Sequence, residues 1–562
     1  MKKIFLNCLI LSCLFFAGCT ENKTSSEEIS NDILYSESNA SYITFSQNIE
    51  IQGNGLSLKD DVVTISSPGT YIVEGKSEEA KIIVNSEAKG EVKIVLKDVS
   101  LTSSKGPVID MEEAEKTYVI VEEGISSITT TEQDDNEESA AILSHDDLVV
   151  TGNGRLNINS ENDGIKANDS LSIQLVTLNI TAGDDGIEVN DYISFESSVL
   201  DILTGEGASE VTSFTPEGGM NFNKDFPKEN DEEMMPPQED ADLENNREMT
   251  PPDQDFSKEM PPINQDGERR KPEGNFDQNG PQNDPMDFNE EIEDDTTPKH
   301  KEIKCDGDIL FKDSDITVNG EDDAIHSNGS ITIESGTFNL KSGDDGIHAD
   351  QTLTINSGSI DISMSYEGLE AKELIINDGN ISVTSSDDGI NTADSSFTGN
   401  NMESDESMLT INGGNIIVNA QGDGIDMNGN GEMNDGSLTV YGPTSGGDGA
   451  IDYAGIFNVN GGTLLAGGSS TMALLPSDTS KVNSLMIDAS NDTQILDEEG
   501  NVVFTYSSEK SYENLVIASS KLETGKTYTI IQDGIEVNTV TITSLQTNLS
   551  TKQNNQFQQR PK

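Results

Sequence analysis

Tryptophan is absent from the 562 residues, and aromatic residues of all kinds make up 5% of the chain. Flat stacking on crystalline glucan, which uses large aromatic side chains, is therefore poorly supported. Basic residues are also scarce: 33 Lys and Arg stand against 103 Asp and Glu, which gives a net charge of −70. Nucleic-acid binding needs basic patches, so we expect no nucleic-acid partner.

Cysteine is equally scarce, and its positions exclude a disulfide framework. Cys8 and Cys13 precede Cys19, and after Cys19 only Cys305 remains. Stability must therefore come from packing rather than from covalent links. The sequence also lacks the Cys/His spacing typical of zinc sites. Beyond Cys19, no apolar run approaches transmembrane length.

The N-terminus has the pattern of an export signal. Met1-Lys2-Lys3 precedes an apolar run over residues 4–17, which ends at Phe16-Ala17-Gly18-Cys19. This ending resembles the bacterial lipobox, whose cysteine is lipidated. We therefore expect a lipoprotein signal peptide over 1–19, a flexible spacer over 20–41, and lipid attachment at Cys19 on the extracellular side of the cell membrane. The alternative is a plain cleaved signal with an incidental Cys19 and a secreted protein.

An acidic signature recurs through the rest of the chain. It is clearest at Asp344-Asp345-Gly346-Ile347-His348. The same 22-residue spacing separates Asp163 from Asp185, Asp323 from Asp345, and Asp345 from Glu367. A fixed period of this size indicates a solenoid, in which each repeat stacks on its neighbours.

Short alternating runs separate these signatures. Leu171-Ser172-Ile173 and Ile331-Thr332-Ile333 alternate apolar and polar residues, as strands do, while Asn-Gly and Ser-Gly pairs mark turns. Three short strands in each 22-residue repeat predict an all-β fold, a right-handed parallel β-helix. Atypical strand segments at both ends predict an N-terminal β cap and a C-terminal β cap.

Composition divides the solenoid into parts. We expect the N-terminal cap and first part of the β-helix over 42–209, the second part over 305–481, a C-terminal β cap over 482–545, and a polar tail over 546–562. Residues 210–304 carry 12 of the 17 prolines and many acidic residues, which predicts a disordered insertion. This insertion is either a solvated loop that the fold tolerates or a tether that attracts calcium or a partner.

Stacking places the doubled acidic residues in columns. Equivalent residues of successive coils lie about 4.8 Å apart, so the like charges repel unless a cation neutralises them. Ca²⁺ fits, because it takes six to eight oxygen ligands. The alternatives are that acidic charge only keeps the protein soluble and that Asp-Gly is only turn chemistry. The candidate calcium ligands are Asp163, Asp184, Asp185, Asp322, Asp323, Asp344, Asp345, Glu367, Asp387, Asp388 and Asp423.

A second column should lie beside the first. Each signature has an apolar residue that points inward, such as Ile347, so the residue after it points outward. His326 and His348 are then neighbours, either as surface histidines or as ligands. The candidate ligand surface consists of Lys166, Glu188, His326, His348, Glu370 and Asp426, with Asn391 and Asp452 in the same column.

The ordered series Asp322-Asp323-Ala324-Ile325-His326, Asp344-Asp345-Gly346-Ile347-His348 and Glu367-Gly368-Leu369-Glu370 resembles a known family. It is similar to the secreted bacterial carbohydrate-binding β-helix proteins associated with plant-cell-wall degradation. The resemblance covers about residues 42–545, apart from the insertion. It implies a right-handed parallel β-helix related in fold to pectate lyases, bound calcium, and affinity for acidic plant polysaccharide such as polygalacturonate.

Three functions compete at this point. The leading interpretation is calcium-dependent binding of acidic polysaccharide by a monomeric surface lipoprotein. The second is a calcium-dependent polysaccharide lyase, for which Lys166, Lys341 and Lys372 are the candidate bases near signatures. Neighbouring carboxylates raise the pKa of a lysine, which opposes that role. The third is a structural surface adhesin or scaffold.

Overall fold

The computed structural model describes residues 35–131, 139–208, 300–398, 404–444, 446–489 and 492–551. These residues belong to one compact unit, which comprises residues 1–217 and 298–562. A second unit, residues 218–297, lies outside the described residues. The predicted signal peptide with Cys19, most of the spacer, most of the insertion and the end of the polar tail also lie outside them.

The prediction of an all-β fold is confirmed. The described residues contain one short 3₁₀ helix, η2 (Glu37–Asn39), and otherwise only strands, turns and irregular segments. Forty-one strands belong to one hydrogen-bonded sheet, most of them in parallel pairs, and four belong to a second sheet. No helix within the described ranges is both long and apolar enough to span a membrane.

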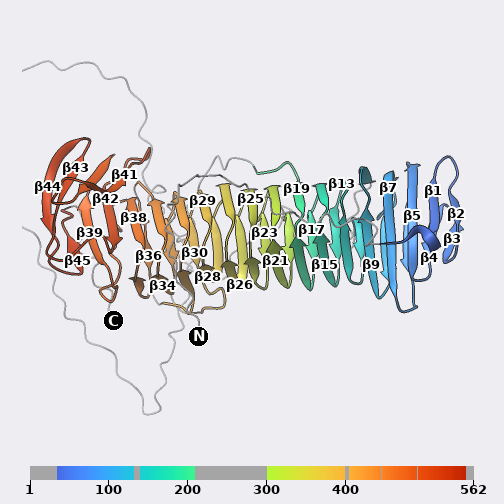
Figure 1. Cartoon of the computed structure of the whole chain (residues 1–562), viewed down its shortest axis with the longest axis horizontal. Coiled ribbons are helices and arrows are strands. Elements are labelled where there is room, and N and C mark those ends of the chain that lie inside the picture. The colour runs from blue at the N-terminus through green and yellow to red at the C-terminus, as the bar shows by residue number, and fades with distance from the viewer. Residues whose placement is uncertain are drawn as a thin grey trace, which may run out of the picture. The chain divides into compact units, whose positions relative to one another are not determined.

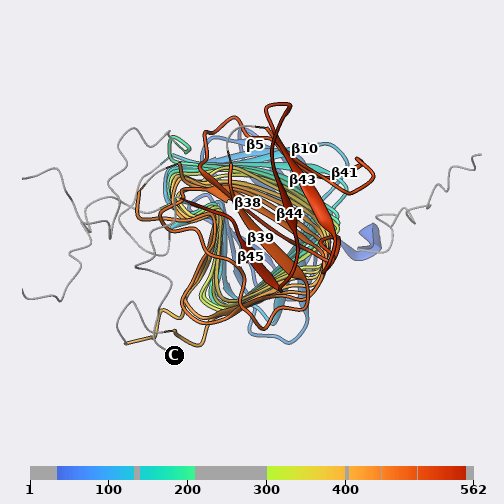
Figure 2. The same cartoon turned by 90° about the vertical axis from the view of Figure 1, so that its left-hand side faces the viewer.

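The large sheet contains three parallel ladders, which run along the row of strands in Figure 1. Through most of the row, each strand pairs with the third strand after it, so three strands form one coil. Viewed from the C-terminal end, successive coils lie behind one another (Figure 2).

Ladder 1 carries the acidic signatures. It contains β4 (Val62–Ile65), β6 (Lys81–Asn85), β8 (Ile109–Glu113), β11 (Ala140–Ser144), β14 (Asp163–Ala167), β17 (Ile187–Val189), β20 (Ile303–Cys305), β23 (Ile325–Ser327), the first halves of β26 (Ile347–Ile355) and β28 (Leu369–Ile376), β30 (Ile390–Thr392), β33 (Ile425–Met427) and β36 (Asp452–Tyr453).

Ladder 2 follows ladder 1 around each coil. It contains β1 (Ser41–Phe45), the first halves of β5 (Gly69–Ser77) and β7 (Glu91–Ser103), β9 (Lys116–Val121), β12 (Leu148–Gly152), β15 (Ser170–Gln174), β18 (Tyr192–Glu196), β21 (Asp308–Lys312), β24 (Ile331–Ile333), the second halves of β26 and β28, β31 (Met408–Ile411), β34 (Asn430–Met433) and β37 (Phe457–Val459).

Ladder 3 completes the coil. It contains the second halves of β5 and β7, β10 (Ile125–Thr130), β13 (Arg155–Ser160), β16 (Thr177–Ala182), β19 (Val199–Thr204), β22 (Ser314–Asn319), β25 (Gly336–Lys341), β27 (Ser359–Met364), β29 (Asn380–Thr384), β32 (Asn415–Asn419), β35 (Ser437–Tyr441) and β38 (Thr463–Gly468).

The core runs through the middle of the coils. The apolar residue of each signature is buried, with an exposed fraction of at most 3%, as predicted: Ile165, Ile187, Ile325, Ile347, Leu369, Ile390, Ile425 and Ile451. Ile165 pairs in register with Ile187, so one period of the sequence is the length of one coil. Each coil buries its apolar residues against those of the coils on either side, which supplies the hydrophobic stabilisation that one coil lacks.

The ladders continue in register across the segment from 209 to 299. β17 pairs with β20, β18 with β21 and β19 with β22, all parallel. The rings of Phe195 and Phe311, which are partners in this register, are stacked with their centroids 4.7 Å apart. Both sides of the insertion therefore form one stack.

Residues 300–304 differ from the expected boundary, because the insertion was expected to extend to residue 304. The structure places residues 300–304 in the stack, where β20 is the ladder 1 strand of a complete coil. This coil lacks the acidic signature, and its sequence follows directly on the proline-rich stretch. The sequence pattern therefore gave no reason to separate it from the insertion.

The parallel ladders meet antiparallel strands at both ends. β2 (Glu50–Gln52) pairs with β1, and β3 (Leu56–Lys59) pairs with β4. At the other end β42 (Asn514–Ser519) pairs with β38 and with β39 (Asn483–Asp488), which also pairs in parallel with β45 (Gln546–Asn548). The second sheet has the order β41-β40-β43-β44, with bounds Val502–Tyr506, Thr493–Leu496, Thr527–Gln532 and Ile535–Thr541.

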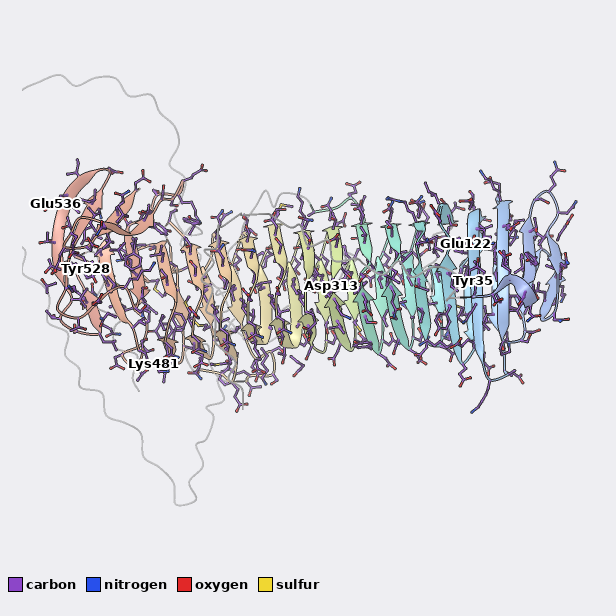
Figure 3. The ribbon with its side chains drawn as sticks, in the orientation of Figure 1. Tyr35, Glu122, Asp313, Lys481, Tyr528 and Glu536 are labelled. Atoms are coloured by element: carbon purple, nitrogen blue, oxygen red, sulfur yellow. The ribbon has the colours of Figure 1, made fainter. Side chains whose placement is uncertain are left out.

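Polar side chains also connect the coils. An asparagine ladder joins turns of successive coils through amide bonds of 2.7 to 3.0 Å between Asn356, Asn377, Asn412, Asn434 and Asn460. Near the N-terminal strands, the Tyr35 hydroxyl donates to Glu122, and both side chains are labelled in Figure 3. Cys305 is buried and has no disulfide partner in the described part of the chain.

Candidate functional site

The acidic signatures form an inner column at the corner that precedes ladder 1. Glycine follows the acidic residue in most coils because the next coil passes very close: a Cβ on Gly346 would lie 2.6 Å from the carbonyl oxygen of Gly368. The inner column is formed by Asp163, Asp185, Lys301, Asp323, Asp345, Glu367, Asp388 and Asp423, each two positions before the buried apolar residue of its coil.

One carboxylate oxygen of these aspartates has a structural role. The Oδ1 atom accepts the backbone N–H of the equivalent residue in the following coil, at 3.2 Å from Asp163 to Asp185 and 3.0 Å from Asp323 to Asp345. The same bond measures 2.6 Å from Asp388 to Asp423. In these pairs Oδ1 holds the next coil, which leaves Oδ2 for other partners.

The outer column lies beside the inner one, on the strands of ladder 1. His326 pairs in register with His348, as predicted, and the ring centroids are 4.8 Å apart. Both histidine side chains are half-buried rather than fully exposed. The outer column consists of Lys166, Glu188, Lys304, His326, His348, Glu370, Asn391, Asp426 and Asp452. The two columns together are called the polar strip below.

The sequence analysis missed two lysines of the polar strip, Lys301 and Lys304. Both come from the coil that was assigned to the insertion. Lys301 occupies the inner column between Asp185 and Asp323, and Lys304 occupies the outer column between Glu188 and His326. Ile303 lies one 22-residue period before Ile325, and this spacing would have revealed the coil.

At the N-terminal end of the polar strip, lysines neutralise the carboxylates. Glu188 bonds to Lys166 and to Lys304, the latter at 2.9 Å. Burial opposes ionisation of Glu188, but these two bonds still lower its pKa. Burial and the charge of Asp185 raise the pKa of Asp163 to about 8, although Lys166 lies 3.6 Å away. Glu188 therefore carries the negative charge that pairs with Lys166.

Lys301 neutralises the next acidic pair. Its ammonium lies 3.2 Å from Asp322 and pairs more closely with Asp323. Asp323 also bonds to His326 at 2.8 Å. Burial opposes ionisation, but the bond to His326 and the charge of Lys301 bring the pKa of Asp323 well below its ordinary value. Asp323 is therefore ionised and paired.

The middle of the polar strip contains one histidine among several carboxyl groups. His348 Nδ1 lies 3.0 Å from Asp345 Oδ2 and 3.3 Å from Glu370 Oε2. Burial alone would lower the pKa of His348, but Asp345 and Glu370 raise it to about 9. Burial and the charge of Asp345 raise the pKa of Glu370 to about 8 and that of Glu367 to about 9. Burial and Asp345 also raise the pKa of Asp344, to about 7.

The C-terminal part of the polar strip, from Glu367 to Asp452, contains no basic side chain. Within the described ranges, no ion pair involves Asp388 or Asp423, and Asp426 lies beside them. Burial and the charge of Asp423 raise the pKa of Asp388 to about 10. Burial also raises the pKa of Asp423, to about 9, although Gly449 donates a backbone hydrogen bond to it. The charged neighbours of Asp388 and Asp423 are therefore other carboxyl groups.

The geometry brings several predicted residues close enough to share a metal ion. In five groups of three, the ligand atoms all lie within 4.8 Å of one another. Asp184, which bonds to His300 at 2.9 Å, lies outside these groups, as do Glu367 and Asp387. The groups are Asp163–Asp185–Glu188, Asp322–Asp323–Asp344, Asp323–His326–His348, Asp345–His348–Glu370 and Asp388–Asp423–Asp426.

Two of the three candidate lyase bases, Lys166 and Lys372, have raised pKa values. Hydrogen bonding to Glu188, against the opposing effect of burial, raises the pKa of Lys166, and bonding to Asp394 raises that of Lys372. Lys341 is exposed. Burial lowers the pKa of Lys510 to about 8, but its ammonium donates to the backbone carbonyls of Ala420 and Tyr441. Lys510 therefore links the C-terminal segment to two coils by hydrogen bonds.

Known proteins offer three points of comparison. The family described as "carbohydrate-binding domain-containing protein" matches residues 59–217, 263–346 and 344–554, more than half of the chain. A protein of that description from Acetivibrio thermocellus (strain ATCC 27405) is 26% identical over 187 residues, which are 31% of this chain. The chain spans 63% of the length of that curated relative.

A solved structure, of the polysaccharide lyase-like protein from C. thermocellum, shares 18% identity with this chain. The alignment covers 58% of this chain and 91% of that one, with a TM-score of 0.32. The family match is the broader finding, because it covers both sides of the insertion. This chain belongs to the family of carbohydrate-binding domain-containing proteins.

Proposed function

We propose that this protein is a right-handed parallel β-helix that binds acidic polysaccharide, such as polygalacturonate, with calcium held by the polar strip. Family membership supports a carbohydrate ligand. The parallel ladders support the β-helix, and parallel crossovers are overwhelmingly right-handed.

The observation that carries the calcium proposal is the group formed by Asp388, Asp423 and Asp426. Three half-buried carboxyl groups lie together in a part of the polar strip that has no lysine, and burial and mutual repulsion raise the pKa of Asp388 to about 10. A hard divalent cation with oxygen ligands removes this repulsion, and Ca²⁺ is such an ion. The donor set therefore fits calcium, since it consists of carboxylate oxygens from two adjacent coils.

The charge of the chain explains why a cation is needed for this ligand. The net charge is −70, so an anionic polymer is repelled by the surface. Carboxylates of the polar strip and of the polymer can share a divalent cation, which converts repulsion into attraction. The columns repeat along the coils, so an extended chain can follow the polar strip past successive coils.

The site of action follows from the N-terminal signal. We propose that the protein is a monomer attached through lipidated Cys19 to the extracellular side of the cell membrane, where polymeric substrates are accessible. Replacing Cys19 by alanine should move the protein from the detergent phase to the aqueous phase in a Triton X-114 partition. Retention in the detergent phase would contradict lipid attachment at this residue.

A binding assay tests the proposed function. Affinity electrophoresis in gels that contain polygalacturonate should show retardation with calcium and normal migration with EDTA. A gel that contains neutral dextran should not retard the protein. Retardation that EDTA does not change would contradict the calcium-dependent mechanism. Release of unsaturated product, measured by ultraviolet absorbance, would favour the lyase over a binding protein.

A matched pair of variants locates the site. Asp388→Asn with Asp423→Asn removes two carboxyl groups that a bound cation would keep ionised, and it should abolish the calcium-dependent retardation. Asp378→Asn with Asp435→Asn makes the same change at exposed turns, where each aspartate accepts the N–H of the glycine after it. Asparagine preserves those turn bonds, so this control should bind like the parent. Equal loss in both pairs would indicate only a general charge effect.

A further inference from the structure

Three of the four histidines of the chain, His300, His326 and His348, lie in or directly before the polar strip. His326 and His348 come from adjacent coils and their ring planes are inclined by 55°. Calcium ligands are oxygen atoms, so imidazoles in this position suggest a second kind of chemistry.

The orientation of the two rings is the first observation that carries the inference. Both rings turn Nδ1 toward the inner column and Nε2 away from it. His326 Nε2 lies 2.9 Å from Asn328 Oδ1, and His348 Nε2 lies 3.3 Å from Asp350 Oδ1. Histidines that bind metals have this arrangement, in which one nitrogen binds the ion and the other donates to a carboxylate or carbonyl.

The spacing around His348 is the second observation. Its Nδ1 lies 3.0 Å from Asp345 Oδ2 and 3.3 Å from Glu370 Oε2, and all three atoms fall within 4.8 Å of one another. Ligands about 2.0 to 2.1 Å from a tetrahedral zinc ion lie about 3.3 Å from each other. His348 Nδ1 therefore already lies at about the separation of neighbouring zinc ligands from both carboxylate oxygens.

The neighbouring charges favour the group of Asp345, His348 and Glu370 over the adjacent group as a metal site. Asp323, His326 and His348 are also close together, but Lys301 is already paired with Asp323. In the described part of the chain, neither Asp345 nor Glu370 forms an ion pair with a lysine or arginine, and both pair with His348. A cation therefore meets less competition at the group of Asp345, His348 and Glu370.

We propose that Asp345, His348 and Glu370 bind one divalent transition metal ion, of which Zn²⁺ is the probe, through His348 Nδ1, whose proton passes to solvent, and two carboxylate oxygens. Imidazole favours zinc, nickel and copper over calcium. Local Cys/His spacing could not reveal such a site, because Asp345 and Glu370 come from two stacked coils and are far apart in the sequence.

Calorimetric titration of the purified protein with Zn²⁺, in the presence of millimolar calcium, tests the proposal. We expect a saturable site that calcium does not displace, and at least about tenfold weaker zinc binding in His348→Gln. His145→Gln is the matched control, since His145 lies outside the polar strip and bonds to Asn168. Its zinc affinity should equal that of the parent.

A spectroscopic measurement separates metal ligation from a general charge effect. Co²⁺ in place of zinc should give visible absorption bands of a nitrogen- and oxygen-ligated ion, and these should disappear in His348→Gln and in Glu370→Gln. Asp388→Asn with Asp423→Asn should leave the bands unchanged, so failure of the calcium proposal and failure of this one are distinguishable. Unchanged zinc affinity in a folded His348→Gln, or displacement of zinc by equimolar calcium, would overturn the proposal.

Discussion

Asp323 and Asp388 occupy the same position of the repeat, three coils apart, and differ in ionisation. Lys301 and His326 hold the pKa of Asp323 well below its ordinary value against the opposing effect of burial. Burial and the charge of Asp423 raise the pKa of Asp388 to about 10. The sequence motif is the same Asp-Asp followed by a small residue, so the motif does not decide the charge.

The difference lies in the neighbouring coils. The N-terminal part of the polar strip receives Lys166, Lys301 and Lys304 and is neutralised by its own side chains. The C-terminal part, from Glu367 to Asp452, contains only carboxyl and amide groups. A repeated motif can thus hold the fold together through ion pairs in one place and bring carboxyl groups together without a lysine in another, according to the side chains stacked beside it.

Removing Lys301 should have the largest effect on stability. Lys301→Met leaves Asp322 and Asp323 buried without their lysine, and breaking a buried pair typically costs about 3 to 5 kcal/mol. Urea unfolding at neutral pH should show this loss. Lys312→Met is the control, since Lys312 pairs with Glu196 at 2.5 Å but both are about half exposed. Its cost should be much smaller, because an exposed ion pair contributes little to stability, and equal costs for both variants would contradict the comparison.

Calcium should distinguish the two parts of the polar strip. At a concentration of 100 Kd, calcium bound only to the native state adds about 2.7 kcal/mol to the free energy of unfolding. Asp388→Asn with Asp423→Asn should remove this increment and, in EDTA, raise the stability of the protein, because folding no longer forces two carboxylates to take up protons. Asp163→Asn with Asp185→Asn should keep the calcium increment. Thermal unfolding with and without calcium measures both, and loss of the increment only in the second variant would reverse the assignment.

The pH dependence of stability in EDTA should report the C-terminal carboxyl groups. The pKa of Asp388 is raised in the folded state, to about 10 from an ordinary value of 3.8, so between these values the folded state binds more protons than the unfolded state. Stability should therefore fall as pH rises from 5 to 8, by up to about 1.4 kcal/mol per pH unit for each such group.

Asp323 should contribute to the pH dependence of stability with the opposite sign and in a different pH range. Its pKa is lowered, so its contribution is complete above pH 4 and is lost only in acid. Unfolding midpoints of the parent should thus depend on pH between 5 and 8, whereas those of Asp388→Asn with Asp423→Asn should be flatter. A parent protein whose stability rises through this range would contradict the raised pKa values.

Deleting residues 209–299 should have the smallest effect. The ladders on both sides pair in register, and Thr204 Oγ1 lies 3.4 Å from the carbonyl oxygen of His300, so a short glycine-serine linker can join the ends. Closure entropy changes by only about 0.6 kcal/mol for each doubling of loop length. Unfolding should stay cooperative with a nearly unchanged midpoint. A longer deletion, to residue 304, should unfold the protein because it removes Lys301, Ile303 and Lys304 from the stack.

Much of the fold was predictable from the sequence. The alternation of apolar and polar residues and the 22-residue period together assign individual residues to positions in the coil. The buried positions of Ile165 and Ile347 and the pairing of His326 with His348 follow from the repeat spacing alone. The coil at 300–305 was missed because Lys301-Glu302-Ile303 has no acidic signature. The asparagine turns were visible in the sequence, but the amide bonds between them depend on the stacking distance.

The ionisation of the site was not predictable in this way. Alternation assigns a side chain to the inside or the outside, but Asp323 and Asp345 are buried although they belong to a polar corner. Their burial arises from neighbouring coils, which cover each carboxylate from both sides. Whether a lysine lies among those neighbours depends on residues that are distant in the sequence. Lys301 is 22 positions from Asp323, and Lys304 is 116 positions from Glu188, on the other side of the insertion.

The bonds from Oδ1 to the backbone of the following coil give the stack a direction. Asp163 accepts from Asp185, Asp323 from Asp345, and Asp388 from Asp423, so each carboxylate protects an amide on its C-terminal side. Where no ion pair links the carboxylate to the coil before it, a substitution in the inner column therefore affects mainly the following coil. Replacing Asp388 by alanine leaves the amide of Asp423 without its acceptor, while the backbone bonds of the coil before it remain. Hydrogen exchange should accelerate downstream of each such substitution and not upstream, and this asymmetry would mark the polarity of the chain in solution.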